Sequence, residues 1–165
     1  MITKALLYSL GCLLLLGSCA SPKYMPSYDK IDVSEYGSYI KIRGNNIEMT
    51  AGELIAIDKG NFIILSEKER KCVSIPLREV NNYTLKYAQP KHYGWTIPVF
   101  SVVSLGHGLL ALISLPVSLS TTSAVTASGE TAFTYNKKSI PIKKLNQFAR
   151  FPQGIPPNIS LEMIK

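Results

Sequence analysis

Apolar and polar residues alternate along much of the region from Gly37 to Tyr87, and this alternation predicts short β-strands. In "SYIKIR", Ile40 and Ile42 are separated by more polar neighbours, as in a strand with one buried face. The turn-forming residues Gly44-Asn45-Asn46 follow. Further apolar runs come next: "IEMTAGELIAID", "FIILS", "CVSIPL" and "YTLKY". We therefore expect roughly four or five strands joined by tight turns.

Two features refine this β segment, which we take as residues 37–95. Gly52 predicts a bulge or a sharp bend in the second run. A short helical turn is expected near Arg78 to Val80, before the last strand. This order, with "AGELIAID" as a bent second strand, resembles SH3-like and Sm-like small β-barrels. The resemblance implies an architecture and no activity, because small barrels carry many functions.

A run without any Asp, Glu, Lys or Arg, Thr96 to Gly129, follows these strands. Its more apolar part, Ile97 to Leu115, would extend for about 28 Å as a helix at about 1.5 Å per residue. That length is close to the hydrocarbon core of a bilayer, about 30 Å. Pro116 is expected to stop or kink such a helix, and the residues after it are rich in Ser and Thr.

Three interpretations of residues 96–129 compete. A single membrane-spanning helix would put the C-terminal segment on the opposite side of the membrane. A helical hairpin, bending near Gly106-His107-Gly108 or Ser114-Leu115-Pro116, would return the chain to the same side on arms too short to cross. Burial in an ordinary core is the third, but a domain this small has little room for it. We favour an apolar, helical hairpin inserted into a mainly β domain.

The β signals return in residues 130–165. "ETAFTYN" predicts a strand, and the Pro-rich tail is expected to wrap the surface. Residues 139–148, "SIPIKKLNQF", repeat the pattern of residues 74–83, "SIPLREVNNY". In each copy we expect a strand ending at proline, one helical turn and an aromatic residue that closes onto the core. The repeat places both β segments in one domain and argues against a single membrane crossing.

The N-terminal segment has the layout of a secretory signal peptide, with Lys4, an apolar run and then small residues. Leu16-Gly17-Ser18-Cys19 resembles the lipobox of bacterial lipoproteins. The resemblance implies a signal peptide over residues 1–18 and attachment of lipid, such as palmitate, at Cys19. The alternative is an ordinary signal peptide cleaved after Ala20, with Cys19 incidental.

Lipid attachment at Cys19 would decide where the protein resides. Several acyl chains anchor a protein stably, whereas one chain is marginal. By analogy with the sorting rule of proteobacterial lipoproteins, Ala20 in place of Asp favours the outer membrane. The absence of an acidic run after Cys19 favours the periplasmic face. Residues 19–36 are polar and contain proline, and we expect them to form a tether.

The net charge limits the kinds of partner that the chain can bind, and the cysteine content limits its disulfides and metal sites. The net charge of +7 is distributed over several Lys and Arg clusters, and in an exported protein it favours anionic lipid or peptidoglycan rather than nucleic acid. Cys12 leaves with the signal peptide and Cys19 carries lipid, so Cys72 stands alone. We expect no disulfide within the mature chain, no metal site and no cofactor.

Little in the sequence indicates an enzyme, and we predict no catalytic residue. Gly-x-Ser-x-Gly and His-Glu-x-x-His are absent. His107, between two glycines, is expected to be neutral with one hydrogen bond; a hydrolase that uses it is the less favoured alternative. His92, Tyr93 and Trp95 suit either a membrane-interface belt or an ordinary packed surface.

The lipobox, the "GELIAID" strand, the "GHG…SLP" insert and the closing "ARFPQGIP" together resemble an uncharacterised family of lipoproteins from Bacteroidetes-type bacteria. The resemblance implies an envelope location and carries over no site other than Cys19. We expect a structural or adaptor role in which the insert docks on membrane, on an envelope protein or on a second copy. The alternative is a periplasmic module that binds a lipid or small ligand.

Overall fold

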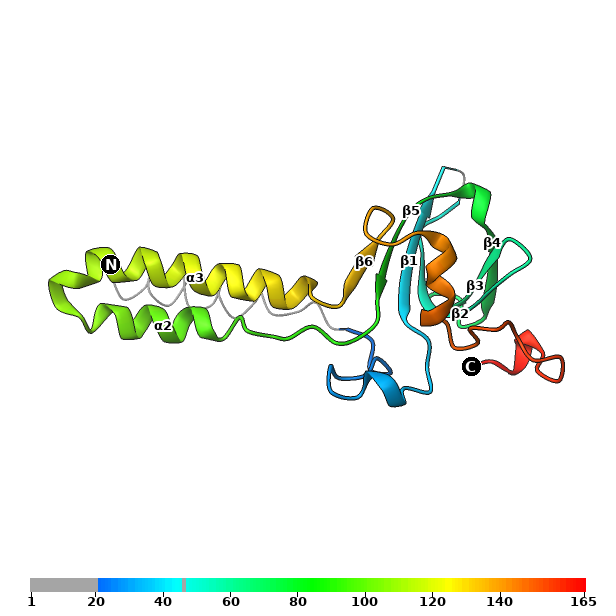
Figure 1. Cartoon of the computed structure of the whole chain (residues 1–165), viewed down its shortest axis with the longest axis horizontal. Coiled ribbons are helices and arrows are strands. Elements are labelled where there is room, and N and C mark those ends of the chain that lie inside the picture. Colours follow the sequence, from blue (N-terminus) through cyan, green and yellow to red (C-terminus); the bar gives the residue numbers. More distant parts are fainter. Residues whose placement is uncertain (1–20, 46) are drawn as a thin grey trace. The chain divides into compact units, whose positions relative to one another are not determined.

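The computed structural model of the protein describes residues 21–45 and 47–165 (Figure 1). The chain divides into two compact units. Pro22–Lys91 and Glu130–Lys165 form the first, which we call the sheet unit, and His92–Gly129 belongs to the second, the hairpin unit. The expected signal peptide, residues 1–18, and the expected lipid attachment site, Cys19, lie outside the described residues.

The sheet unit contains one six-stranded sheet in the order β4-β3-β2-β1-β5-β6, with antiparallel neighbours throughout. The strands are β1 (Tyr39–Gly44), β2 (Thr50–Asp58), β3 (Asn61–Ser66), β4 (Cys72–Pro76), β5 (Val80–Lys86) and β6 (Thr134–Asn136). The mainly β prediction is confirmed. Over the described part of the chain, no pairing joins the outer strands β4 and β6, so the sheet is open at both edges.

Strands β1 and β3 show the alternation that their sequences predict. Ile40 and Ile42 of β1, and Phe62 and Ile64 of β3, are fully buried, while their neighbours along each strand are more exposed. Side chains point to opposite faces of a sheet in turn, so this pattern buries one face. The buried side chains of these strands form the core together with residues of β2, β4, β5 and the C-terminal segment.

Strand β2 departs from simple alternation, because residues 52–56 are all buried. Leu54 pairs with Ile64 and Ala56 with the adjacent Ile63, so Ile55 is the extra residue of a bulge. Of the bulge or sharp bend predicted at Gly52, the bulge is therefore wrong in position by three residues. Gly52 serves instead for close approach, because a Cβ atom there would lie 2.0 Å from the Leu65 carbonyl oxygen of β3.

Both copies of the sequence repeat contain a proline followed by a short helix. Pro76 precedes η2 (Leu77–Glu79), and Pro141 precedes η4 (Ile142–Phe148). The helical turn expected near Arg78 is confirmed. The strand expected before Pro141 is absent, because the amides of Ser139 and Ile140 both bond to the Asn136 carbonyl and form a turn. Two further single turns are η1 (Ile31–Val33) and η5 (Leu161–Met163).

The aromatic residue that closes the first copy also links the two copies. Tyr83 is 1% exposed, and its ring lies 6.4 Å from that of Phe62. Its hydroxyl donates a hydrogen bond to the backbone carbonyl of Ile140. Phe148, the equivalent residue in the second copy, packs against the edge of the core. The C-terminal segment is thus attached to β5 through side chains as well as through β6.

Replacing Tyr83 by phenylalanine is expected to lower the free energy of unfolding by about 1–2 kcal/mol, because the Ile140 carbonyl loses its partner inside the protein. Urea unfolding followed by circular dichroism measures this change. Tyr39→Phe is the matched control, because the Tyr39 hydroxyl meets Glu67 at 3.4 Å on the surface. Equal stability of Tyr83→Phe and the parent protein would contradict the prediction.

The hairpin unit contains the helices α2 (Thr96–Leu105), η3 (Gly108–Leu110) and α3 (Ala111–Thr131). The chain turns at Gly106-His107-Gly108, the first of the two expected bends, and Gly108 has a φ of +61° that favours glycine. Pro116 lies inside α3, so the expectation that it stops the helix is wrong. Inside a helix, proline removes one backbone hydrogen bond and crowds the carbonyl four residues earlier, and α3 nevertheless continues past it to Thr131.

Candidate functional site

The candidate site is the surface of the hairpin unit, and its attachment to the chain limits what it can do. The hairpin connects β5 to β6, which pair directly at Thr84↔Asn136, Leu85↔Tyr135 and Lys86↔Thr134. Both ends of the insert therefore start from one sheet. A single membrane crossing would separate β5 and β6 by a bilayer, so that interpretation of residues 96–129 is wrong.

Large apolar side chains cover the outside of the hairpin. Leu109 is 89% exposed and Leu112 is 81% exposed. The exposed set consists of Val99, Phe100, Val102, Val103, Leu105, Leu109, Leu110, Leu112, Ile113, Val117, Leu119 and Val125. Burial in an ordinary core is therefore wrong for this segment. Contiguous apolar surface of this kind marks an interaction site on a protein or a membrane.

Small polar residues join the two arms of the hairpin, which run side by side in Figure 1. Ser104 of α2 is 2% exposed, and its hydroxyl lies 2.8 Å from the hydroxyl of Ser118 in α3. Thr122, also in α3, is 8% exposed. Small residues let helix backbones approach closely, and hydroxyl contacts between helices stabilise the pair in an apolar medium.

Many of the remaining hydroxyl groups of the hairpin bond to the backbone of their own helix. Ser101 donates to the Ile97 carbonyl at 2.7 Å and Ser120 to the Pro116 carbonyl at 2.8 Å. Thr121 and Thr122 make the same kind of bond one turn back. A hydroxyl satisfied in this way costs less to remove from water than a free one. The Ser and Thr content of α3 is thus compatible with an apolar environment.

His107 lies at the tip of the hairpin. Its Nδ1 atom is 3.2 Å from the hydroxyl of Ser114, which gives it the one hydrogen bond that the sequence led us to expect. A nucleophilic triad contains a hydroxyl beside an imidazole. It also contains a third group that orients the imidazole. Residues 96–129 contain no Asp or Glu. The contact links the turn to α3.

A shallow apolar groove of about 310 Å³ runs between α2 and α3 on the half of the hairpin away from the tip. It is lined by Thr96, Phe100, Val117, Ser118, Thr121, Thr122 and Val125. Pockets for small ligands start at about this size. The groove is therefore wide enough for an acyl chain or a small apolar ligand.

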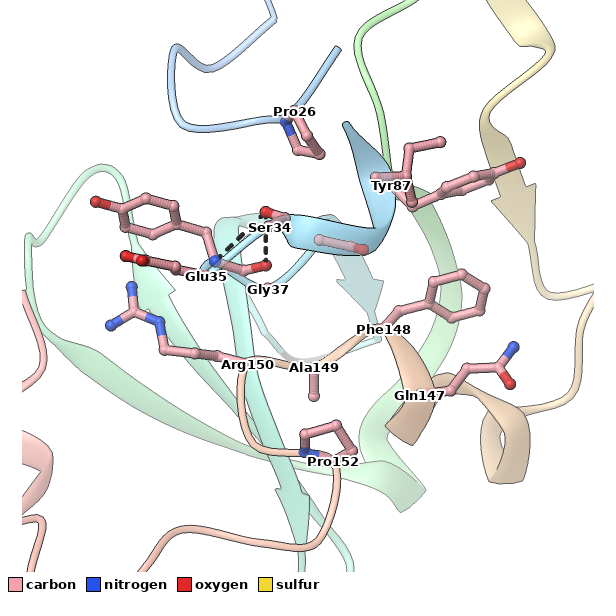
Figure 2. A pocket seen from close by; sticks show the side chains of 13 residues that line it. Pro26, Ser34, Glu35, Gly37, Tyr87, Gln147, Phe148, Ala149, Arg150 and Pro152 are labelled. Atoms are coloured by element: carbon pink, nitrogen blue, oxygen red, sulfur yellow. Dashed lines mark hydrogen bonds between the residues drawn. The ribbon is translucent and has the colours of Figure 1, made fainter. Parts of the chain in front are cut away.

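The sheet unit has a separate pocket of about 260 Å³, shown in Figure 2. One wall comes from residues 26–38 and the other from residues 147–152, with Tyr87 between them. The walls combine backbone groups with side chains such as Ser34, Gln147 and Arg150. The Ser34 hydroxyl is already paired with the backbone of Tyr36. The pocket therefore lies between two chain segments, and its Ser34 and Arg150 side chains are engaged within the protein.

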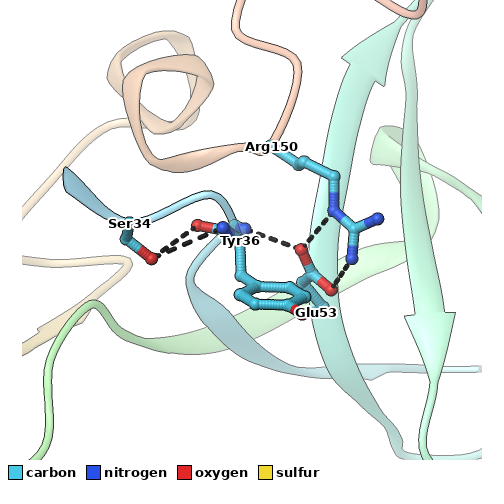
Figure 3. Close-up of polar contacts among 5 residues, drawn as sticks. Ser34, Tyr36, Glu53 and Arg150 are labelled. Atoms are coloured by element: carbon cyan, nitrogen blue, oxygen red, sulfur yellow. Dashed lines mark hydrogen bonds and ion pairs between the residues drawn. The ribbon is translucent and has the colours of Figure 1, made fainter. Parts of the chain in front are cut away.

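Arg150, at the rim of this pocket, forms a buried ion pair with Glu53 of β2 (Figure 3). The Arg150 Nε donates to Glu53 Oε1 at 2.7 Å and Nη2 donates to Oε2 at 2.5 Å. The backbone amide of Gly37 donates to Oε1 at 2.6 Å. Hydrogen bonding to Glu53 holds the pKa of the Arg150 guanidinium above its usual range. The carboxylate thus binds three segments of the sheet unit together, and this role is structural.

Sequence reasoning did not identify this ion pair. The two residues are 97 positions apart, and Glu53 lies in an apolar strand where no charged neighbour marks it. The only local signal was the position itself, because a carboxylate in the middle of a buried strand requires a partner. Which of the 18 Lys and Arg residues supplies that partner depends on the fold.

Thiol chemistry and metal binding are two other ways in which side chains form a functional site. Cys72 is a free thiol, and burial raises its pKa, so it is protonated at neutral pH and a poor nucleophile. Within residues 21–45 and 47–165, no group of three or more His, Cys, Asp and Glu side chains is placed to hold a metal ion. The exposed hairpin therefore remains the feature of the described chain with the clearest capacity for interaction.

No family model, curated protein or solved structure matches this chain.

Proposed function

We propose that this chain is a lipid-anchored protein of the bacterial envelope with a structural or adaptor role, and that its hairpin docks on a membrane. The observation that carries this proposal is the uncharged helical hairpin, inserted between two paired strands and covered with exposed apolar side chains. A soluble protein rarely exposes a surface of this kind without a partner.

The energetics favour lipid as that partner. Removing one exposed Leu or Ile side chain from water contributes about 1.5–3 kcal/mol. Five such residues surround the turn: Leu105, Leu109, Leu110, Leu112 and Ile113. The arms contain no charged side chain between Thr96 and Gly129, and several of their hydroxyl groups bond internally. The transfer of the apolar side chains from water to lipid is favourable, and few polar groups of the hairpin oppose it by losing their hydration.

Lipid attachment at Cys19 would hold the sheet unit close to the same membrane. The lipobox, the small residues before the cysteine and Ala20 after it support an outer-membrane lipoprotein facing the periplasm, in a family of Bacteroidetes-type lipoproteins. The strand order β4-β3-β2-β1-β5 and the short helix η2 between β4 and β5 support an SH3-like or Sm-like origin for the sheet. Neither feature calls for catalysis, and we propose no enzymatic activity.

The decisive experiment removes the anchor. Cys19→Ala protein, exported through a signal peptide that is not lipidated, is expected to sediment with membranes after a high-salt wash, because the hairpin binds without help from the acyl chains. Fractionation and immunodetection measure the distribution. Release of the protein as a soluble monomer would contradict docking by the hairpin. Binding to native membranes but not to protein-free lipid vesicles would indicate a protein partner.

A second function is favoured by the groove between α2 and α3. A module that carries a lipid or small apolar ligand would use this groove, of about 310 Å³, as part of its binding site. Mild extraction followed by mass spectrometry of bound lipid distinguishes the two functions. A stoichiometric lipid that stays with the soluble Cys19→Ala protein would favour the carrier, and a lipid-free protein would favour docking.

A further inference from the structure

We propose that the hairpin enters one leaflet only, tip first, with Gly106-His107-Gly108 near the middle of the bilayer and Trp95 at the headgroup level. This inference rests on the proposed docking to membrane and specifies its depth and direction. The occupant of the apolar surface is the acyl-chain region of a phospholipid leaflet.

The distribution of apolar side chains gives the direction of entry. All but one of the exposed large apolar residues of the two helical arms lie between Val99 and Leu119, on both sides of the turn. Beyond Leu119, α3 continues as "STTSAVTASGET", where Val125 is the one exposed large apolar residue. The apolar surface is therefore concentrated around the tip and declines toward the ends of the insert.

The length of the shorter arm sets the depth. Helix α2 has 10 residues, which extend for about 15 Å at about 1.5 Å per residue. The apolar part of α3, from Ala111 to Leu119, has nearly the same length. Half of a hydrocarbon core of about 30 Å is about 15 Å. Both apolar arms thus match one leaflet.

Helix α3 with η3, Gly108–Thr131, is by itself long and apolar enough to cross a membrane. Its neighbour α2 prevents this, because both arms connect to the paired strands β5 and β6 and must enter from the same side. A full crossing would draw Lys91 and the non-helical residues before Thr96 into the hydrocarbon. Unpaired backbone groups and a charge are both costly there. The Ser- and Thr-rich half of α3 then lies at the headgroup level.

The turn at the tip pairs part of its backbone within the hairpin. The amides of Gly106 and His107 bond to the carbonyls of Val103 and Ser104 at 3.1 and 3.2 Å. The His107 imidazole contacts the Ser114 hydroxyl. Each backbone group that is paired within the protein avoids the cost of an unsatisfied group in hydrocarbon. At the other end, Trp95 is 63% exposed, and tryptophan favours the membrane interface.

The position of Trp95 can be measured directly, because it is the only tryptophan of the chain. The lipidated protein is reconstituted on vesicles of phosphatidylcholine and phosphatidylglycerol whose acyl chains carry bromine either near the headgroup or near the terminal methyl group. Trp95 fluorescence is expected to be quenched about twofold more by the shallow bromine, as for a residue at the edge of the hydrocarbon core. For Trp95→Phe/Leu109→Trp the order is expected to reverse, as for a residue near the bilayer centre.

The quenching measurements distinguish an error in the depth of insertion from a failure of the hairpin to dock on the membrane. Quenching of the Leu109→Trp variant by iodide trapped inside the vesicles would mean that the tip emerges on the far side, and would overturn the single-leaflet inference alone. Absence of quenching by either bromine, while the acyl anchor keeps the protein on the vesicle, would overturn the docking itself. Trp95→Phe/Leu161→Trp is the control, because Leu161 is partly exposed on the sheet unit and is expected to respond only to external iodide.

Discussion

Replacing Arg150 by alanine is expected to lower the free energy of unfolding of the sheet unit by about 3–5 kcal/mol, because the change leaves a buried carboxylate without its partner. Glu53 is 3% exposed, and Arg150 supplies two of the three hydrogen bonds that its oxygens accept. The remaining donor is the Gly37 amide, which carries no net charge. Folding of the variant must either bury the ionised carboxylate nearly unpaired or protonate it.

Urea unfolding followed by far-ultraviolet circular dichroism measures the loss. Lys68→Ala is the matched control, because Lys68 pairs with Glu48 through side chains that are 74% and 79% exposed. Exposed pairs contribute about 0–1 kcal/mol, so the control is expected to stay close to the parent protein. A double variant, Glu53→Leu with Arg150→Met, is expected to recover part of the stability, because apolar residues of similar volume often replace buried ion pairs without loss, while the Gly37 amide loses its acceptor. Similar losses in Arg150→Ala and Lys68→Ala would contradict the role of the pair.

Replacing Leu112 by aspartate is expected to reduce membrane binding of the Cys19→Ala protein about 100-fold, since a charged residue at the centre of a membrane helix costs about 2.5–3.5 kcal/mol. Leu112 is 81% exposed at the start of α3, so the change should leave the fold intact. Flotation with lipid vesicles measures the partition coefficient, and circular dichroism verifies the helices.

Leu161→Asp is the matched control for this experiment, because Leu161 is 40% exposed but belongs to the sheet unit. It is expected to leave vesicle binding unchanged. Loss of binding in both variants would point to a general effect of negative charge on an anionic surface. Unchanged binding in Leu112→Asp would mean that the tip stays in water.

The alternation of β1 and β3 could be read from the sequence, and the turn of the hairpin could be limited to two positions, because each depends on residues close together in the chain. Period-two alternation reports which side of a strand is buried, and Gly108 supports the left-handed backbone that the turn requires. The repeat around Pro76 and Pro141 predicted two short helices for the same reason. It failed for the strand before Pro141, because the amides there bond to Asn136.

Features that depend on neighbours across the fold could not be read in this way. The bulge lies at Ile55 and not at Gly52, because its position is set by how β2 pairs with β3. The pairing of β6 with β5 decides between a single crossing and a hairpin, and it joins strands on opposite sides of the insert. The partner of Glu53 lies in the C-terminal segment, and nothing near Glu53 in the sequence indicates it.

The sequence by itself determined the strand periodicity, the uncharged insert and two candidate positions for its turn, because periodicity, charge and glycine content are local properties of the chain. Only the tertiary structure decided the strand order, the open edges of the sheet, the Glu53–Arg150 pair and the exposure of the hairpin. Apolar residues are favoured both in a protein core and in a membrane. A run of apolar residues therefore looks the same in the sequence whichever of the two surrounds it. The difference lies in what surrounds it, which follows from contacts between residues that are distant along the chain.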